Sequence, residues 1–291
     1  KNPQSKVVIK TNFHGTSSLF ILAEWWHLFD KITEKQDHMD LFIKDQSALV
    51  TGSSKGIGLA VAKSLAAEGC HLHLASRTES DLRAVAREIR DNFGVDVTSH
   101  AVDLSRTQDQ ASLFANCKDI DILVNNAGAI PRGGIEHLDD EAIREAWELK
   151  LFGYINLSRD FYGYMKERQS GVIMNVVGGA ANNPTYQYIA GTMANVALQN
   201  FTIALGKESQ NYGVRVLGVH PSVTETERMV SHHEKQAEIE VGNKSRWREF
   251  VPKLPFGRPT TAQEVADLVT FLVSGRASYT SGVMVNVTGG M

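Results

Sequence analysis

The chain has 291 residues, of which 42% are hydrophobic and 22% charged, the composition of an ordinary soluble globular protein. Lys and Arg number 30 against 33 Asp and Glu, so the formal net charge is -3 and no long-range field attracts nucleic acid. No basic run with interleaved aromatic residues occurs either, and we expect no nucleic-acid partner.

Cysteine and histidine usage predicts a reducing compartment and no metal site. The two cysteines, Cys70 and Cys117, do not form a CxxC spacing. The pair His232–His233 could ligate a metal, but it lies in the charged stretch His-His-Glu-Lys, and no third ligand follows at a helical spacing. We expect this pair on a solvated helix face.

The first 38 residues do not resemble the rest of the chain. Their apolar run, Leu19–Ala23, is too short to span a bilayer and lacks the cleavage pattern of a signal peptide. We therefore predict a cytoplasmic protein without a membrane partner. Met39 would make a natural start, so residues 1–38 are interpreted as an N-terminal extension, vector-derived or upstream, with amphipathic helical spacing over Ser18–Lys35.

From residue 39 onward, short apolar runs alternate with helical stretches. Strands are predicted, in chain order, at Ser47–Thr51, His71–Ala75, Val97–Val102, Ile120–Asn125, Gly171–Val177, Val214–His220 and Val283–Val287. Helices are predicted up to Glu68, over Ser80–Asn92, over Asp140–Lys166 and up to Tyr212. This alternation implies right-handed βαβ crossovers, with ligands at the carboxyl ends of the strands. The predicted fold class is α/β: one Rossmann-type domain over residues 39–291, a doubly wound parallel sheet of about seven strands with helices on both faces.

A glycine-rich turn, Thr51–Gly58, follows the first predicted strand and precedes its helix. Gly52 can adopt the turn, Gly56 lets the backbone approach a pyrophosphate, and Gly58 allows helix and strand to pack closely. The start of the helix then offers unpaired N–H groups and a positive dipole end to the phosphates. The sequence therefore predicts a dinucleotide-binding site at this turn.

Several motifs occur in the order found in one enzyme family. They are the TGxxxGxG spacing at 51–58, Asp103-Leu104, Asn125-Asn-Ala-Gly128, Phe256-Gly-Arg-Pro259 and Val287-Thr-Gly-Gly290. The chain resembles a short-chain dehydrogenase/reductase from about residue 42 to its C-terminus. The resemblance implies a Rossmann fold that binds a nicotinamide dinucleotide.

The end of the second strand, Ala75-Ser76-Arg77, favours NADP over NAD. NAD-binding sheets usually end this strand in an acidic residue that bonds the ribose 2′-hydroxyl. Here Ser76 occupies that place, and Arg77 can pair with a 2′-phosphate. Lys55 is a second cation in the region where the family uses one for NADP. The alternative is that both are ordinary surface cations.

The resemblance assigns the other cofactor contacts by position. It places Asp103 and Leu104 beside the adenine, Asn126 and Gly128 against the adenosine ribose, and the segment 221–226 at the nicotinamide. The predicted cofactor-binding residues are Gly52, Ser54, Lys55, Gly56, Ile57, Gly58, Ser76, Arg77, Asp103, Leu104, Asn126, Gly128, Pro221, Thr224 and Thr226.

The catalytic groups of the family do not occupy their usual places. The resemblance implies an asparagine that supports a relay water, a serine that orients the carbonyl, a tyrosine that exchanges the proton and a lysine that favours its phenolate. By spacing, these four positions fall on Lys150, Gly178, Gly191 and Asn195. A shorter loop would make Tyr188 the tyrosine, but Thr192 would then stand for its lysine.

Two residues are predicted to supply the missing chemistry. Tyr188 lies about one helical turn from position 191, and Lys150 is a cation where the family keeps a neutral amide. We assign Tyr188 as the general acid and Lys150 as the group that lowers its pKa. The alternative is that Tyr188 packs a loop and Lys150 reaches solvent. His220, before a proline at a strand end, is interpreted as structural.

These observations favour an NADP(H)-dependent oxidoreductase that transfers hydride between nicotinamide and a small carbonyl or alcohol substrate. Residues 227–252 are expected to form a lid over that substrate, and the resemblance implies a homodimer or homotetramer. One alternative is a cofactor-binding protein without turnover, acting as a redox sensor or an oligomer partner. Another is a lyase or hydrolase on the same pocket, which the retained cofactor motifs favour least.

Overall fold

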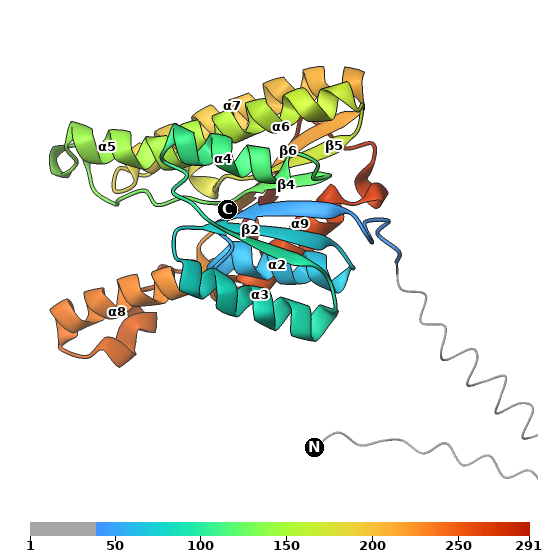
Figure 1. Cartoon of the computed structure of the whole chain (residues 1–291). Helices are drawn as coiled ribbons and strands as arrows, with labels where there is room; N and C mark the ends of the chain where they lie inside the picture. The colour runs from blue at the N-terminus through green and yellow to red at the C-terminus, as the bar shows by residue number, and fades with distance from the viewer. Residues whose placement is uncertain (1–38) are drawn as a thin grey trace, which may run out of the picture. The chain divides into compact units, whose positions relative to one another are not determined.

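A parallel sheet of seven strands forms the centre of the structure, a computed structural model that describes residues 39–291 (Figure 1). The strand order is β3-β2-β1-β4-β5-β6-β9. The strands are β1 (Ser47–Thr51), β2 (His71–Ser76), β3 (Val97–Ala101), β4 (Ile122–Asn125), β5 (Gly171–Val176), β6 (Val214–Pro221) and β9 (Met284–Val287). The order reverses between β1 and β4, which confirms the predicted Rossmann-type class. The predictions for residues 1–38 lie outside the described residues.

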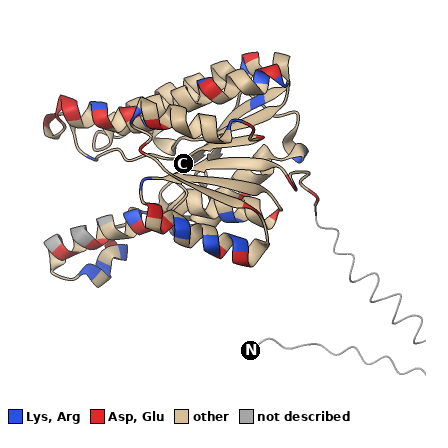
Figure 2. Cartoon of the chain, viewed as in Figure 1, with Lys and Arg blue, Asp and Glu red and all other residues tan. Residues whose placement is uncertain are grey.

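Helices cover both faces of the sheet (Figure 1). One layer contains α2 (Gly56–Ala67), α3 (Glu79–Phe93) and α9 (Ala262–Val273), and the other α4 (Thr107–Cys117), α6 (Gly153–Glu167) and α7 (Ile189–Ser209). Outside these layers lie α5 (Asp140–Trp147) and α8 (Glu227–Val241), the latter followed by a 3-10 helix over Lys244–Phe250. Charged residues gather on the outer helices, while the sheet carries few (Figure 2). Within the described range, no helix is both long and apolar enough to cross a membrane.

The strands form where the sequence offers continuous apolar runs. Ala48, Leu49 and Val50 of β1 have no exposed surface, as expected for a strand covered by helices on both faces. Every predicted strand agrees with the observed one to within two residues at either end. Sequence reasoning missed only the short parallel pair β7 (Thr224–Glu225) and β8 (Thr260–Thr261), which lies next to the start of α8.

The long helix predicted over Asp140–Lys166 is divided into two. Between α5 and α6, residues Glu148–Phe152 form a π-helical turn, in which the N–H of Gly153 donates to the carbonyl oxygen of Glu148. The wider turn buries Lys150, although a lysine would ordinarily face solvent on such a helix. Single π turns of this kind are frequent at functional sites.

A chain of buried amides connects the sheet to α6 and α7. The Nδ2 of Asn125 donates to Ser158 Oγ at 3.0 Å and to Asn175 Oδ1 at 2.9 Å, and the Nδ2 of Asn175 donates to Thr202 Oγ1 at 2.9 Å. Buried networks of this kind fix one arrangement of the groups they join, because each unpaired member would cost free energy. The network therefore fixes the positions of the two helices that border the candidate site.

Candidate functional site

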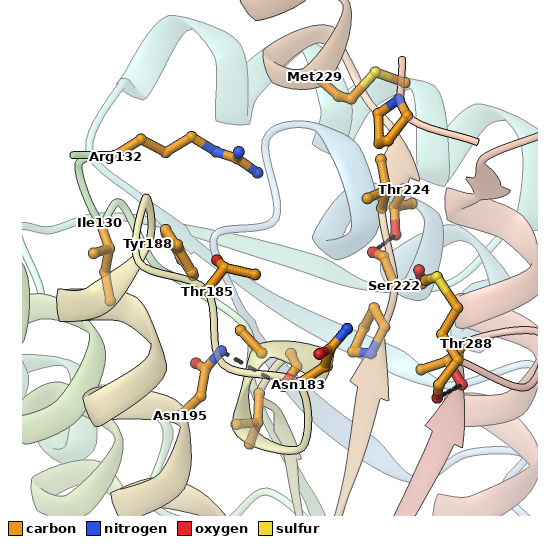
Figure 3. Close-up of a pocket in the computed structure, with 18 of the residues that line it drawn as sticks. Ile130, Arg132, Asn183, Thr185, Tyr188, Asn195, Ser222, Thr224, Met229 and Thr288 are labelled. Atoms are coloured by element: carbon orange, nitrogen blue, oxygen red, sulfur yellow. Dashed lines mark hydrogen bonds between the residues drawn. The ribbon is translucent and has the colours of Figure 1, made fainter. Parts of the chain in front are cut away.

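Two adjoining cavities lie at the carboxyl ends of the central strands. The first, of about 450 Å³, is bordered by the glycine-rich turn, the end of β2 and the loops after β4, β5 and β6, and we call it the groove. The second, of about 560 Å³, is bordered by the loops after β4 and β5 and by α8, and we call it the pocket (Figure 3). Both are lined by Ile130, Val177, Gly178, Tyr188, Pro221, Ser222, Thr224, Thr226 and Arg228.

The groove collects nearly all of the predicted cofactor residues. Of the fifteen named from the sequence, all except Gly58 and Asp103 line it. Gly58 lies beneath the turn, where an added Cβ would be 2.3 Å from the carbonyl oxygen of Gly52. The carboxylate of Asp103 accepts hydrogen bonds from the N–H and the hydroxyl of Ser105. Asp103 lies between Val102 and Leu104, which both line the groove, and its contact with an adenine stays a prediction.

Close packing and hydrogen bonds hold the glycine-rich turn against the loop after β4. Gly52 has a φ of +65°, and an added Cβ would be 2.9 Å from the Cα of Ala127. Thr51 Oγ1 accepts hydrogen bonds from the N–H groups of Asn126 and Ala127, and Asn126 Nδ2 donates to the carbonyl oxygen of Thr51. The turn thus directs the N-terminus of α2 at the groove, an arrangement that suits a phosphate.

The end of β2 leaves one polar atom of the groove without a partner. Ser76 Oγ is buried and has no hydrogen-bond partner in the described part of the chain. Arg77 and Lys55 line the same end of the groove. A serine in place of the acidic residue, in a groove that two cations also line, fits the 2′-phosphate of NADP and lacks the carboxylate that usually receives the ribose of NAD.

Tyr188 occupies the space of the side chain that position 191 lacks. An added Cβ at Gly191 would be 2.1 Å from Cε1 and 2.2 Å from Cζ of the Tyr188 ring. The Tyr188 ring therefore lies where the Cβ of a residue at 191 would be, and Tyr188 lines both the groove and the pocket. Tyr188 is the N-cap residue of α7. Tyr186, in contrast, is half exposed, and its hydroxyl contacts Glu136.

Positions 178 and 195 face each other beside Tyr188. Asn195 Nδ2 donates a long hydrogen bond of 3.5 Å to the carbonyl oxygen of Gly178, and Asn195 Oδ1 is buried without a partner among the described residues (Figure 3). Gly178 has a φ of +135°, a conformation in which a side chain is strained. An added Cβ would also be 2.8 Å from Asn195 Nδ2. Glycine at 178 therefore suits the local backbone, and a serine would require adjustment.

Lys150 is buried under the junction of groove and pocket and does not reach solvent. Its Nζ donates to the carbonyl oxygen of Val177 at 2.8 Å and lies 5.4 Å from the centroid of the Tyr154 ring. Gly128 makes room for its stem, since an added Cβ would be 3.0 Å from Lys150 Cδ. Burial, followed by repulsion from Arg228, lowers the pKa of Lys150 to about 8. The side chain can therefore gain or lose a proton near neutral pH.

The cations that act on Tyr188 differ from the one predicted. Burial raises the pKa of the Tyr188 phenol, and the opposing influences come from Arg132 and Arg228. Arg132 lies over the ring, with its guanidinium carbon 5.6 Å from the ring centroid. Lys150 is not among the groups that shift this pKa and is held by Val177 beneath the junction, so its predicted effect on Tyr188 stays a prediction.

Two histidines belong to the surroundings of the site. His220 is buried, with Nε2 2.7 Å from Gln199 Oε1, and its pKa is lowered by burial, raised by the backbone of Gly178 and lowered by Lys150. It supports the residues below the junction, in line with a structural role. His233 is also buried and lines the pocket, so the prediction of a solvated face is wrong for it. It lies on the side of α8 that covers the pocket.

Sequence reasoning missed the two arginines of the pocket. Arg132 lies in the loop after β4, and Arg228 is the second residue of α8. Neither belongs to a motif that the family resemblance identified. The only signal in the sequence was that a cation follows each of two motifs, Asn125-Asn-Ala-Gly128 and the segment 221–226, at a short distance.

A separate group of possible metal ligands lies away from the groove and the pocket. His73, His100 and Cys117 place their ligand atoms within 4.8 Å of one another. The two histidine rings stack at 5.2 Å and join Nδ1 of His73 to Nε2 of His100 at 2.9 Å. The sequence spacing of these residues did not suggest a group, because β2, β3 and α4 bring them together only in the fold.

Comparison with known proteins agrees with this architecture. Residues 46–237 match the family model of the short chain dehydrogenases. The chain is 32% identical to the 2,3-dihydro-2,3-dihydroxybenzoate dehydrogenase of Bacillus subtilis over 255 residues, which cover 85% of this chain and 96% of the relative.

Solved structures are similar over almost their whole length. L-sorbose reductase from Gluconobacter frateurii, complexed with NADPH and L-sorbose, superposes with a TM-score of 0.83 at 30% identity, covering 87% of this chain and 98% of the reductase. A variant of actinorhodin polyketide ketoreductase with NADPH gives 0.79 at 29% identity, covering 84% and 97%. Because the family model matches well over half of its residues, the chain belongs to the short chain dehydrogenase family.

Proposed function

We propose that this protein is an NADP(H)-dependent oxidoreductase that acts on a small carbonyl or alcohol substrate through a rearranged catalytic site. The observation that carries the proposal is the place of Tyr188. Its ring lies where the Cβ of a side chain at position 191 would be, and it lines both the groove and the pocket. A divergent member of the family would in this way keep its phenol while the residue that carries it has moved along the chain.

The groove fits the proposed cofactor. The unpartnered Ser76 Oγ, with Arg77 and Lys55, suits the 2′-phosphate, and the N-terminus of α2 suits the pyrophosphate. Two related structures were solved with NADPH. Bound NADPH would supply a hydride to the carbonyl carbon of the substrate. The residues of this chain would bind the substrate, orient it and provide the proton for the carbonyl oxygen.

Tyr188 is the proposed proton donor. Negative charge grows on the carbonyl oxygen as hydride arrives, so a donor must lie within hydrogen-bonding distance. The phenol would give its proton to that oxygen, and Arg132 and Arg228 would stabilise the phenolate that remains, against the opposing effect of burial. In the reverse direction the phenolate would take the proton of an alcohol.

Lys150 and Asn195 are proposed to have exchanged roles. The family resemblance expects an amide at 150 and a lysine at 195, and this chain has the reverse. Lys150 therefore keeps one ammonium group below the junction, with a pKa of about 8, while Asn195 keeps one amide beside Gly178. Lys150 would restore the proton of Tyr188 through water between turnovers.

The proposal is tested by NADPH oxidation with a panel of aldehydes, ketones and quinones. We expect Tyr188→Phe to abolish turnover while NADPH still binds with unchanged affinity, because the ring stays and only the hydroxyl is lost. Tyr186→Phe is the matched control, since that hydroxyl contacts Glu136 and does not line the pocket. Turnover that survives Tyr188→Phe would contradict the assignment. NADPH binding without reduction of any carbonyl would favour a cofactor-binding protein without turnover.

Further parts of the proposal concern the architecture around the site. Residues 39–291 would act as one domain, in which Met229, His233 and Pro252 of the segment 227–252 border the pocket as a lid. A homodimer or homotetramer is proposed as the functional assembly. It is supported by apolar side chains that remain exposed near the start of α6 and on α7, namely Phe152, Met193 and Val196.

A further inference from the structure

The pocket is positively charged on the side where a substrate would enter. Arg132 and Arg228 reach it from the loop after β4 and from α8, and His233 borders it, whereas no Asp or Glu is among its lining residues in the described part of the chain. Lys150 lies just below. This local balance contrasts with the whole chain, in which acidic residues outnumber basic ones by 33 to 30.

The two arginines have no carboxylate partner within 4.0 Å among residues 39–291. The contacts that the structure gives these two arginines are to uncharged groups. Arg228 Nη2 donates to the carbonyl oxygen of Gly128 at 3.0 Å, and Arg132 lies over the Tyr188 ring. Elsewhere on the surface, Arg144, Arg246 and Arg258 each pair with a carboxylate at 2.6 Å. The pocket arginines are thus left with most of their donors open.

Both arginines act on the group that would protonate the substrate. Arg132 and Arg228 each lower the pKa of the Tyr188 phenol, and Arg228 also lowers the pKa of Lys150. Two cations therefore act on the Tyr188 hydroxyl, and one of them, Arg228, also acts on the ammonium of Lys150 below it. Like charges at such a site repel one another, and an anion placed among them relieves that repulsion.

We infer that the substrate carries an anionic group next to its reacting carbonyl, and that Arg132 and Arg228 bind this group. A guanidinium binds a carboxylate or a phosphate through two parallel hydrogen bonds, which would orient the neighbouring carbonyl toward Tyr188. The substrate class is accordingly a short oxo acid or keto phosphate, or the corresponding hydroxy compound. This inference rests on the proposed function for the reaction, but not for the binding of the anion.

The two arginines differ in the cavities that they line. Arg132 lines only the pocket, whereas Arg228 lines both the pocket and the groove and could also contact a cofactor phosphate. Figure 3 shows Arg132 beside Tyr188, across the pocket from Ser222 and Thr224. Arg132 is therefore the residue whose loss should affect the substrate alone, and the affinity for NADPH must be measured separately for Arg228 variants.

The test compares charged and neutral forms of the same carbonyl. Acetoacetate is paired with methyl acetoacetate, pyruvate with methyl pyruvate, and dihydroxyacetone phosphate with dihydroxyacetone. We expect the full-length protein with NADPH to prefer at least one anion over its neutral form by about ten-fold or more in kcat/KM, and Arg132→Gln to remove that preference. Arg144→Gln, at an exposed arginine of α5 that pairs with Asp140 and lines neither cavity, is the control and should change nothing. The acid pairs and the phosphate pair show which anion is preferred.

Equilibrium binding keeps the inference testable if no turnover is found. Acetoacetate, pyruvate and dihydroxyacetone phosphate are titrated by calorimetry into the NADPH-saturated protein. Binding that Arg132→Gln weakens about ten-fold, without turnover, would support the anion site and contradict the proposed reaction. Reduction of the neutral ketones at least as efficient as that of the anions would support the reaction and overturn the inference. An Arg132→Gln variant that treats every pair as the parent does would also overturn it.

Discussion

At the scale of single residues, the proposed site would have a catalytic phenol carried by a different residue of the chain. The structure places the Tyr188 ring where the side chain of residue 191 would begin, and this is possible only because Gly191 has no side chain. Lys150 and Asn195 similarly provide an ammonium and an amide on opposite helices. If the proposal holds, the site keeps the same kinds of chemical group and changes the residues that carry them.

The protonation state of the Lys150 side chain should determine where activity falls at alkaline pH. Its pKa is about 8, so the ammonium is present below that pH and is lost as the pH rises through it. We expect kcat to fall above about pH 8 in the parent protein. In Lys150→Met this limb should disappear, with a lower plateau that no longer changes near pH 8. The measurement is a pH–rate profile at saturating NADPH and substrate. If kcat of Lys150→Met still falls above about pH 8 as in the parent protein, another group causes the fall.

Arg77 should decide the choice between the two cofactors. It lines the groove beside the unpartnered Ser76 Oγ, where the 2′-phosphate of NADP would lie. A charge-assisted hydrogen bond contributes about 1.5–3 kcal/mol. Arg77→Ala should therefore weaken NADPH binding roughly ten-fold or more and leave NADH binding almost unchanged. Fluorescence titration with both cofactors measures this. Equal affinities for NADPH and NADH in the parent protein would contradict the cofactor assignment.

At the scale of elements, the strands could be predicted and the turns within helices could not. A strand such as β1 is buried on both faces, so its apolar run marks it in the sequence directly. The glycine-rich turn could be predicted because its spacing follows from the close approach of α2 to the loop after β4. The π turn at Glu148–Phe152 leaves no comparable pattern, since one extra residue in a helical turn hardly changes the hydrophobic periodicity.

The arrangement at the start of α7 could not be predicted from the sequence either. Spacing alone assigned an empty position to Gly191 and placed Tyr188 nearby, but whether the phenol fills that position depends on the backbone at the helix N-cap. The partners of Tyr188 were likewise hidden, because Arg132 and Arg228 are far apart in the sequence and meet only in the fold. Lys150 could be singled out as an unexpected cation, while its burial depended on the π turn and on Gly128.

The contact between Gly191 and Tyr188 gives a stability test of the α7 N-terminus. Alanine normally stabilises a helix by roughly 1 kcal/mol relative to glycine. In the parent protein Gly191→Ala should instead lower the free energy of unfolding, because its Cβ would be 2.1 Å from Cε1 of Tyr188. In a Tyr188→Ala background the same change should be stabilising. Urea unfolding of the four proteins measures both signs. If Gly191→Ala stabilises both backgrounds, the ring does not fill that space.

At the scale of the whole molecule, α6 and α7 lie side by side on the outside of the sheet, and apolar side chains near their starts are exposed among the described residues (Figure 1). Met193 and Val196 on α7 are 41% and 37% exposed, and Phe152, the residue before α6, is 42% exposed. Single exposed apolar residues are common, but three at neighbouring helix starts are typical of a surface that meets another subunit. Such a surface would lie next to the π turn that carries Lys150 and the N-cap residue Tyr188, so assembly and catalysis would be linked.

This link predicts that dissociation of the oligomer should also reduce activity. Met193→Glu combined with Val196→Glu would place like charges at the symmetric contact, which costs several kcal/mol when two copies of one surface meet. We expect sedimentation velocity to show a dimer or tetramer for the parent protein and a monomer for the double variant, with reduced kcat because α7 loses its support. Val241→Glu, an equally exposed apolar residue at the end of α8, should leave the assembly intact. A parent protein that sediments as a monomer at micromolar concentration would show that this surface serves another purpose.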